Sequence, residues 1–301
     1  MNYDRFIQEA KTKDCDILRD EPLSRHTTFR IGGTADWMVI PHTAQAAGEL
    51  YTLLEKEGLP WFPLGRGSNL LVGDGGYRGV VLKSANKYGH LSFDGEAVEV
   101  DAGVSLARLC YSAYQHGLSG LEFAWGIPGS VGGAAYMNAG AYDGEMKDVL
   151  SSVTFWEGGE ETTFSREECG FSYRHSYFSD RNCLITRVSL ALRAGEKGTI
   201  KEKMDDLLGR RYTKQPMEQP SAGSTFKRPQ GSYASKLIDE CGLRGFSVGG
   251  ARVSEKHCGF VVNADGATCA DVLGLIAEVQ RIVREKTGFS LEPEVRFLGE
   301  Q

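Results

Sequence analysis

Residues 126–144 read GIPGSVGGAAYMNAGAYDG, a stretch in which glycine recurs too often for a stable helix or strand. The other residues of the stretch are mostly small and apolar, which is unusual for a linker exposed to solvent. We therefore predict a loop whose backbone packs closely against something flat. A tightly packed turn is the simpler alternative, and the length of the glycine-rich run favours the first interpretation.

A second glycine-rich segment lies about sixty residues earlier, where residues 64–72 read LGRGSNLLV after a predicted strand. Glycine permits positive φ and lets backbone N–H groups gather around a phosphate, and Ser68 and Asn69 add side-chain donors. The segment lacks the Gly-Lys-Ser/Thr ending of a P-loop and the acidic residue that completes a Rossmann fingerprint. By itself it is equally consistent with an ordinary turn between strands.

Together, the two loops suit a dinucleotide such as FAD. One loop would hold the pyrophosphate while the other meets the edge of the isoalloxazine ring with backbone N–H and C=O groups. The predicted cofactor-binding residues are Gly65, Arg66, Gly67, Ser68, Asn69, Leu70, Gly126, Ile127, Pro128, Gly129, Ser130, Gly132, Gly133, Asn138, Ala139 and Gly140.

The rest of the chain alternates predicted strands and helices. A strand–helix–strand unit covers 36–40, 43–57 and 61–64. Further strands are predicted at 70–72, 79–83, 97–101, 153–156, 183–192 and 291–298, and further helices at 105–116, 200–212 and 233–241. A last helix begins at Thr268, with Asp271 close to a capping box and a buried stripe formed by Val272, Ile276, Val279 and Val283. The composition shifts near Gly195, so we predict one domain over 1–195 and a second over 196–301.

Composition excludes several classes of protein. A net charge of −6 gives no overall attraction for nucleic acid or anionic membranes. No apolar run approaches the roughly 18 residues of a membrane span, and the charged first ten residues do not resemble a signal peptide. The seven cysteines form no CxxC pair and the histidines show no metal-binding spacing, so we expect free thiols, no metal and a cytoplasmic protein.

Six short motifs occur in a specific order: TFRIGG at 28–33, the two glycine loops, YR at 173–174, GSTFK at 223–227 and LEPEVRF at 291–297. In this order, and over residues 23–299, they closely resemble the UDP-N-acetylenolpyruvoylglucosamine reductase family. Each motif is short, and their order makes the resemblance specific. The interval between Arg174 and Ser224 is only 50 residues, which resembles the family's shorter branch, so closure over substrate is expected to differ from the longer one.

The resemblance implies an α+β fold with an FAD-binding region of the vanillyl-alcohol-oxidase (PCMH) type in two subdomains. A smaller α/β substrate-binding domain follows, and the active site is expected at their junction. The resemblance also implies that non-covalent FAD, reduced by NADPH as co-substrate, reduces the enolpyruvyl ether of a UDP-sugar in peptidoglycan precursor synthesis. No nucleic acid, membrane or obligate protein partner is expected.

Three catalytic residues are implied by the same resemblance. Arg174 would meet the substrate carboxylate with a bidentate guanidinium, although a surface arginine in a loop is the simpler interpretation. Ser224 would donate the proton, although a serine beside glycine is commonly a turn residue. Glu294 would share charge that develops on the carboxylate, with a raised pKa, although an ion pair with Arg296 or Lys286 is the alternative.

Several basic side chains bracket Ser224, and for most of them a solvated surface is the expected role. They are Arg210, Arg211, Lys214, Lys227 and Arg228. We select Lys214 and Arg228, together with Tyr173, as predicted substrate-binding residues. Two other functions remain open from sequence: an FAD-dependent oxidase of the vanillyl-alcohol-oxidase superfamily, and a non-catalytic nucleotide-sugar binder.

Overall fold

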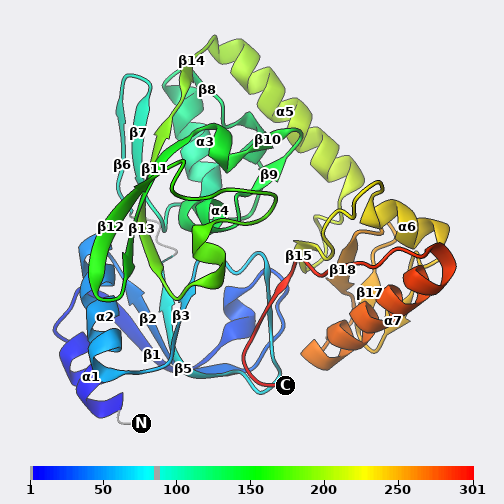
Figure 1. Cartoon of the computed structure of the whole chain (residues 1–301), viewed down its shortest axis with the longest axis horizontal. Coiled ribbons are helices and arrows are strands. Elements are labelled where there is room, and N and C mark those ends of the chain that lie inside the picture. The colour runs from blue at the N-terminus through cyan, green and yellow to red at the C-terminus, as the bar shows by residue number, and fades with distance from the viewer. Residues whose placement is uncertain (1–2, 85–88) are drawn as a thin grey trace. The chain divides into compact units, whose positions relative to one another are not determined.

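The computed structural model describes residues 3–84 and 89–301 (Figure 1). Its contacts divide the chain into two compact units, neither of which is a continuous segment of sequence. The first unit comprises Met1–Arg19, Trp37–Arg66 and Gly79–Gly209. The second comprises Asp20–Asp36, Gly67–Arg78 and Arg210–Gln301. Segments far apart in the sequence therefore build each hydrophobic core.

A four-stranded sheet near the N-terminus has the strand order β1-β2-β5-β3. Its strands are β1 (Cys15–Pro22), β2 (Thr34–Pro41), β5 (Tyr77–Lys83) and β3 (Trp61–Leu64), and β3 pairs with β5 in parallel. Helices α1 (Tyr3–Ala10) and α2 (Ala44–Glu57) contribute Phe6, Leu50 and Tyr51 to a core shared with Trp61. The structure confirms the predicted strand–helix–strand unit, in which Thr43 caps α2 by accepting from the Ala46 N–H.

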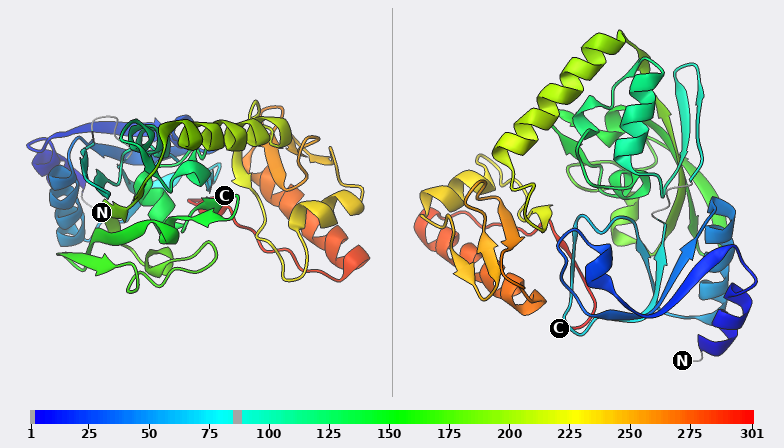
Figure 2. Two further views of the ribbon diagram at one scale, coloured as in Figure 1. Left: turned by 90° about the horizontal axis from the view of Figure 1, so that it is seen from above. Right: turned by 180° about the vertical axis from the view of Figure 1, so that it is seen from behind.

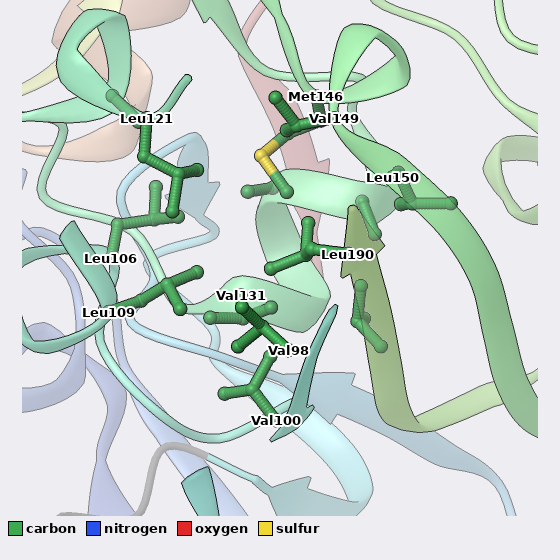
Figure 3. Packing of buried hydrophobic residues seen from close by; sticks show 14 of the residues in the cluster. Val98, Val100, Leu106, Leu109, Leu121, Val131, Met146, Val149, Leu150 and Leu190 are labelled. Carbon is green, nitrogen blue, oxygen red and sulfur yellow. The ribbon is translucent and has the colours of Figure 1, made fainter. Parts of the chain in front are cut away.

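A five-stranded antiparallel sheet carries the larger core of the first unit, with the order β12-β11-β13-β7-β6. The strands are β12 (Glu160–Ser165), β11 (Leu150–Glu157), β13 (Leu184–Ala191), β7 (Ala97–Asp101) and β6 (Leu91–Asp94). Helix α3 (Leu106–Gln115) and helix α4 (Val131–Tyr136) pack their apolar side chains against this sheet. Figure 3 shows Leu106, Leu109 and Val131 from the helices close to Val98 and Leu190 from the strands.

Helix α4 corrects the prediction that residues 126–144 form only a loop. Ser130 caps this short helix by accepting from the Gly133 N–H, so a local signal for a helix was present among the glycines. A Cβ added at Gly132 would lie 2.6 Å from the Cβ of Ala102. The helix therefore approaches the segment after β7 only because this position has no side chain. The same stretch ends in the hairpin of β9 (Gly140–Ala141) and β10 (Gly144–Glu145).

The second unit contains a four-stranded antiparallel sheet with the order β15-β18-β17-β16. Its strands are β15 (Ser221–Ser224), β18 (Phe260–Asn263), β17 (Ala251–Val253) and β16 (Ser247–Val248). Helices α6 (Ala234–Glu240) and α7 (Cys269–Thr287) share its core (Figure 2). The predicted capping box of Thr268 and Asp271 is present, and the predicted stripe of α7 is buried.

The remaining elements are one long helix and several short strands and turns. They are β4 (Leu70–Val72), β8 (Leu118–Ser119), β14 (Arg193–Ala194), α5 (Lys197–Lys214), β19 (Arg296–Leu298) and the 3₁₀ turns at Leu23–His26, Glu122–Ala124, Met146–Asp148 and Tyr177–Asp180. No helix in the described part of the chain is long and apolar enough to cross a membrane. Separate helices and mainly antiparallel sheets confirm the predicted α+β class.

The predicted terminal strand at 291–298 is wrong over its first half, since β19 covers only Arg296–Leu298. Pro293 has no N–H to donate and forms only an isolated bridge with Phe226. The Glu294 N–H donates instead to the Thr225 carbonyl at 2.8 Å. Glu294 therefore lies in an extended segment that pairs with the residues after β15, outside any regular strand.

Candidate active site

The two glycine loops meet at one close contact within the first unit. A Cβ added at Gly65 would lie 2.4 Å from the Ser130 Oγ, too close for any real contact. That oxygen accepts from the Gly133 N–H at 3.3 Å, which caps helix α4. The structure thus brings together two loops that the sequence separates by about sixty residues, and Gly65 is required for their approach.

We expect Gly65→Ala to disturb this contact by forcing the Ser130 hydroxyl away from its cap. An N-cap contributes about 1 kcal/mol, so the variant should lose roughly that amount of stability together with part of its affinity for the cofactor. The double variant Gly65→Ala/Ser130→Ala should be no less stable than Ser130→Ala alone, because the nearest remaining atom is the Ser130 Cβ at 3.5 Å. Thermal unfolding of the three proteins measures this; fully additive losses would contradict the predicted contact.

The first loop turns sharply at Gly67, whose φ is +60°. A Cβ at this position would meet the His26 carbonyl oxygen at 2.4 Å, and the Gly67 carbonyl accepts from the Thr28 N–H at 3.2 Å. Beside this turn, the buried Thr27 Oγ1 has no hydrogen-bond partner in the described part of the chain. A buried hydroxyl without a partner next to a glycine turn fits a polar ligand such as a phosphate. The sequence prediction missed Thr27, which directly precedes the TFRIGG motif.

Asn69 links the first glycine loop to the segment that carries Glu294. Its Nδ2 donates to the Glu294 carbonyl at 3.1 Å, and its own carbonyl accepts from the Arg296 N–H at 3.0 Å. Asn69 was predicted to contact the cofactor, and these bonds show that it also supports the segment that carries Glu294 within the second unit.

Ser224 and Glu294 lie on adjoining segments of the second unit, joined through Thr225. Ser224 is the exposed last residue of β15, follows Gly223 with φ of +78°, and pairs with Phe260. The Thr225 carbonyl accepts from the Glu294 N–H at 2.8 Å. The Ser224 hydroxyl makes no hydrogen bond to any described residue, so it can donate to a ligand. Ser224 is therefore neither a helix cap nor buried in the core.

Arg174 occupies the tip of a two-residue turn in the first unit. Ser172 and His175 exchange both backbone hydrogen bonds, at 3.0 and 3.3 Å, which closes the turn. Arg174 itself has a φ of +53°, a conformation that costs a residue with a side chain about 1–3 kcal/mol. Its Nη2 donates to the Gly140 carbonyl at 2.7 Å, and its guanidinium lies 5.1 Å from the Tyr173 ring centre. The partly buried guanidinium is thus held against the second glycine loop.

Backbone strain concentrates around this arginine. The described residues include six with side chains and positive φ, namely Asp20, Arg30, Asn138, Tyr142, Asp143 and Arg174. Four of these six belong to the Arg174 turn or to residues 138–143, which that turn contacts at Gly140. Strained conformations persist where the surrounding structure enforces them, and they cluster at functional sites. This clustering supports a functional role for the Arg174 turn.

Comparison with known proteins identifies the family. The sequence profile described as "UDP-N-acetylenolpyruvoylglucosamine reductase, C-terminal domain" matches residues 215–298, and that of an FAD-binding domain matches residues 35–164. A UDP-N-acetylenolpyruvoylglucosamine reductase from Caldanaerobacter subterraneus subsp. tengcongensis is 45% identical over 290 residues, which cover 96% of each chain. One from Clostridium perfringens is 47% identical over 300 residues, covering 99% of this chain and 98% of the relative. The chain belongs to the UDP-N-acetylenolpyruvoylglucosamine reductase family.

Solved structures agree with this assignment. The crystal structure of the family member from Thermus caldophilus superimposes with a TM-score of 0.79 at 36% identity, covering 94% of this chain and 98% of the other. Alkyldihydroxyacetonephosphate synthase superimposes with a TM-score of 0.51 at 17% identity over 64% of this chain, which shows a shared fold alone. The predicted PCMH-type fold is therefore confirmed for this member of the reductase family.

The three predicted substrate-binding residues of this reductase-family chain have different environments. Tyr173 is 46% exposed, and its ring lies against the Arg174 guanidinium. Lys214 is exposed at the C-terminal end of α5. The Arg228 guanidinium lies 4.0 Å from the ring centre of Tyr233. Among the basic residues not selected, Lys227 pairs with Glu292. Lys286, an alternative partner for Glu294, donates instead to the Cys241 carbonyl at 3.0 Å.

A hollow in the first unit was missed at the sequence level. It is lined mainly by residues 41–44, 101–103 and 185–186. His42 is one of the lining residues, and hydrogen bonds to Asp14 and Asp16 raise the pKa of its imidazole. No pattern in the sequence marks these residues as neighbours, because they come from three distant segments.

All seven cysteines lie in the described part of the chain, and each is a free thiol. Burial raises the pKa of Cys110, Cys169 and Cys183 to about 12. Burial also raises the pKa of Cys258 and Cys269 to about 11. The described residues contain no group of three or more metal-binding side chains. These thiols are therefore protonated at neutral pH and suited to packing rather than to nucleophilic chemistry.

We expect the folded protein to react slowly with a colorimetric thiol reagent at pH 8, because the thiolate is the reactive form. Only Cys15 is partly exposed, and burial, Asp16 and Asp14 raise its pKa as well. Native protein should therefore show less than one fast equivalent, whereas denatured protein should show all seven. Two or more fast equivalents in the native state would contradict the burial of these side chains.

Proposed function

We propose that this protein is an FAD- and NADPH-dependent reductase. Its substrate is UDP-N-acetyl-3-O-(1-carboxyvinyl)-glucosamine, its product is UDP-N-acetylmuramate, and it serves peptidoglycan precursor synthesis. The observation that carries this proposal is the match to named reductases along nearly the whole chain, at 45–47% identity. The same observation favours a reductase over an oxidase of the vanillyl-alcohol-oxidase superfamily and over a non-catalytic nucleotide-sugar binder.

The cofactor is proposed to bind at the two glycine loops. Gly65 and Gly67 allow close backbone approach, and Thr27 offers a buried hydroxyl that has no hydrogen-bond partner among the described residues. When bound, FAD accepts a hydride from NADPH and supplies one to the substrate olefin. The predicted loop residues remain candidates for its contacts, and the side chains of Asn69 and Asn138 also make hydrogen bonds within the chain.

Each catalytic residue is proposed to act on a different part of the enolpyruvyl group. The Arg174 guanidinium would bind the carboxylate and stabilise the charge that grows there as hydride arrives. Glu294, in its protonated form, would hydrogen-bond the same carboxylate. The Ser224 hydroxyl, which bonds to none of the residues that the structure describes, would donate a proton to the carbon next to the carboxylate. Tyr173, Lys214 and Arg228 would bind other parts of the UDP-sugar.

The domain assignment and the cellular setting are also proposals. We assign residues 1–195 to FAD binding and 196–301 to substrate binding, with the two profile matches at 35–164 and 215–298 in support. We place the protein in the cytoplasm because its thiols are free and because nucleotide sugars and NADPH are its proposed reactants. The net charge of −6 supports the absence of nucleic-acid and membrane partners, and no obligate protein partner is proposed.

Analysis of the product tests the proposed reaction. Purified protein, NADPH and the enolpyruvyl UDP-sugar should yield a product heavier by two hydrogens, with one NADPH consumed for each product formed. Mass spectrometry and NADPH absorbance measure both quantities. NADPH oxidation that depends on oxygen and yields no reduced sugar would contradict the reductase and support the oxidase. Binding of the sugar without turnover, by flavin-loaded protein, would support the binder.

A further inference from the structure

Asn138 lies at the centre of a buried hydrogen-bond cluster beside the Arg174 turn. Its side chain is fully buried, and its φ of +41° is one that asparagine tolerates better than most residues. Nδ2 donates to the Glu145 Oε2 at 2.8 Å and to the Ser172 carbonyl at 2.9 Å. Oδ1 accepts from the Lys147 N–H at 3.0 Å. Both amide hydrogens are therefore used within the protein, so this side chain has none left for the cofactor.

The bonds of Asn138 connect the two segments that hold Arg174, namely its own turn and the β9–β10 hairpin. Ser172 begins the turn whose tip is Arg174, and its carbonyl is also the acceptor that closes the turn with His175. Glu145 is paired in the hairpin with Gly140, the residue whose carbonyl accepts from the Arg174 Nη2. Asn138 thus fixes the turn that carries the arginine, and through Glu145 it fixes the hairpin against which the guanidinium rests.

Glu145 adds a negative charge to the cluster. Its carboxylate accepts from Asn138 and pairs with the Lys147 Nζ at 2.8 Å. Burial raises the pKa of this carboxyl, but hydrogen bonds from Lys147 and Asn138 and the charges of Lys147 and Arg174 outweigh burial and lower it. Glu145 is therefore ionised at neutral pH and attracts the Arg174 side chain towards its own hairpin. The Asn138–Glu145 pair therefore supports Arg174 both through hydrogen bonds and through the negative charge of Glu145.

We propose that Asn138 and Glu145 are positioning residues that hold Arg174 for the substrate half-reaction and act through that arginine alone. The inference rests on the proposed role of Arg174 at the substrate carboxylate. The turn that carries the guanidinium makes two backbone bonds within itself, so its position depends on the bonds that neighbouring residues make to it. Loss of the Asn138 bonds would let the turn relax and move the guanidinium away from the carboxylate.

The test uses Asn138→Gly, which keeps the positive φ accessible while removing all three side-chain bonds. Stopped-flow absorbance should show FAD reduction by NADPH within about twofold of wild type. Reoxidation by the enolpyruvyl UDP-sugar should slow roughly 10- to 100-fold, the range expected for a misplaced catalytic group. Asn138→Asp, which keeps the acceptor but loses both donors, should show the same asymmetry. Val153→Ala, in the buried core of the same unit, is the control for lost stability and should affect neither half-reaction selectively.

A double-mutant cycle decides whether Asn138 acts through Arg174. In an Arg174→Ala background, adding Asn138→Gly should slow reoxidation by less than about twofold. A full additional loss in that background, or an unchanged rate for Asn138→Gly alone, would overturn the inference. If Arg174→Ala itself leaves reoxidation fast, the proposed role of Arg174 fails instead. Should Asn138→Gly not fold, Glu145→Ala takes its place, with several-fold slower reoxidation expected and an unchanged rate overturning the inference.

Discussion

The Ser224→Ala variant is expected to reduce its FAD with NADPH at nearly the wild-type rate and to fail in the second half-reaction. General acids contribute about 10²–10⁴-fold, so flavin reoxidation by the enolpyruvyl UDP-sugar should slow by that order. The physical reason is that only the second step requires a proton at the substrate carbon. Because Ser224 is exposed and its hydroxyl has no partner among the described residues, its removal should leave stability almost unchanged.

Stopped-flow measurement of each half-reaction under anaerobic conditions checks this expectation. Ser224→Cys should recover part of the rate, because a thiol also carries a proton that can be donated. Thr225→Ser is a matched neighbour, since it keeps the hydroxyl that accepts from the Val261 N–H, and it should retain both half-reactions. A folded, flavin-loaded alanine variant that is fast in both steps would show that Ser224 is not the proton donor.

The Arg174→Lys variant should lose about 10²–10³-fold in turnover although it keeps the positive charge. Lysine cannot form the planar two-point contact with a carboxylate, and it cannot reproduce the bond from Nη2 to the Gly140 carbonyl in the same geometry. The loss should fall on substrate reduction, with reduction of FAD by NADPH little changed. Glu294→Gln should impair the same step, because an amide can donate a hydrogen bond but cannot share a proton as a carboxyl does.

Arg187→Lys is the matched control for the arginine. Arg187 lies on β13 in the same unit and pairs at the surface with Glu99, an interaction worth little in solution. Steady-state kinetics and substrate affinity, read from the perturbation of the flavin spectrum, should separate the two variants. Wild-type turnover in both Arg174→Lys and Glu294→Gln would mean that these residues do not act on the carboxylate.

Local signals in the sequence predicted the elements that depend on local chemistry. Thr43 and Thr268 correctly predicted where α2 and α7 begin, and the stripe from Val272 to Val283 predicted the buried face of α7. Helix α4 was missed because glycine is a poor helix former, whereas here the absence of a side chain at Gly132 is what allows the packing on Ala102. The low helix propensity of glycine was therefore outweighed by a tertiary contact, which cannot be read from the local sequence.

For the site too, the sequence predicted the local motifs but not the contacts between distant segments. The sequence motifs pointed to the two glycine loops and to three catalytic candidates, but they could not show that Gly65 meets Ser130. They placed Asn69 and Asn138 among the predicted cofactor contacts, but they did not indicate that both amides also bind the Glu294 and Arg174 segments. The division of the chain into two discontinuous units depends on contacts between distant segments, which composition along the sequence does not reveal.

The central claim is that bound FAD passes a hydride from NADPH to the olefin of the enolpyruvyl UDP-sugar, and an anaerobic titration tests it most directly. The purified protein should be yellow and release its FAD on acid precipitation, because no covalent link to the flavin is predicted. NADPH should bleach the flavin absorbance, and the enolpyruvyl UDP-sugar should then restore it in the absence of oxygen. Reduced flavin that stays bleached until air is admitted, in folded and fully loaded protein, would contradict the account.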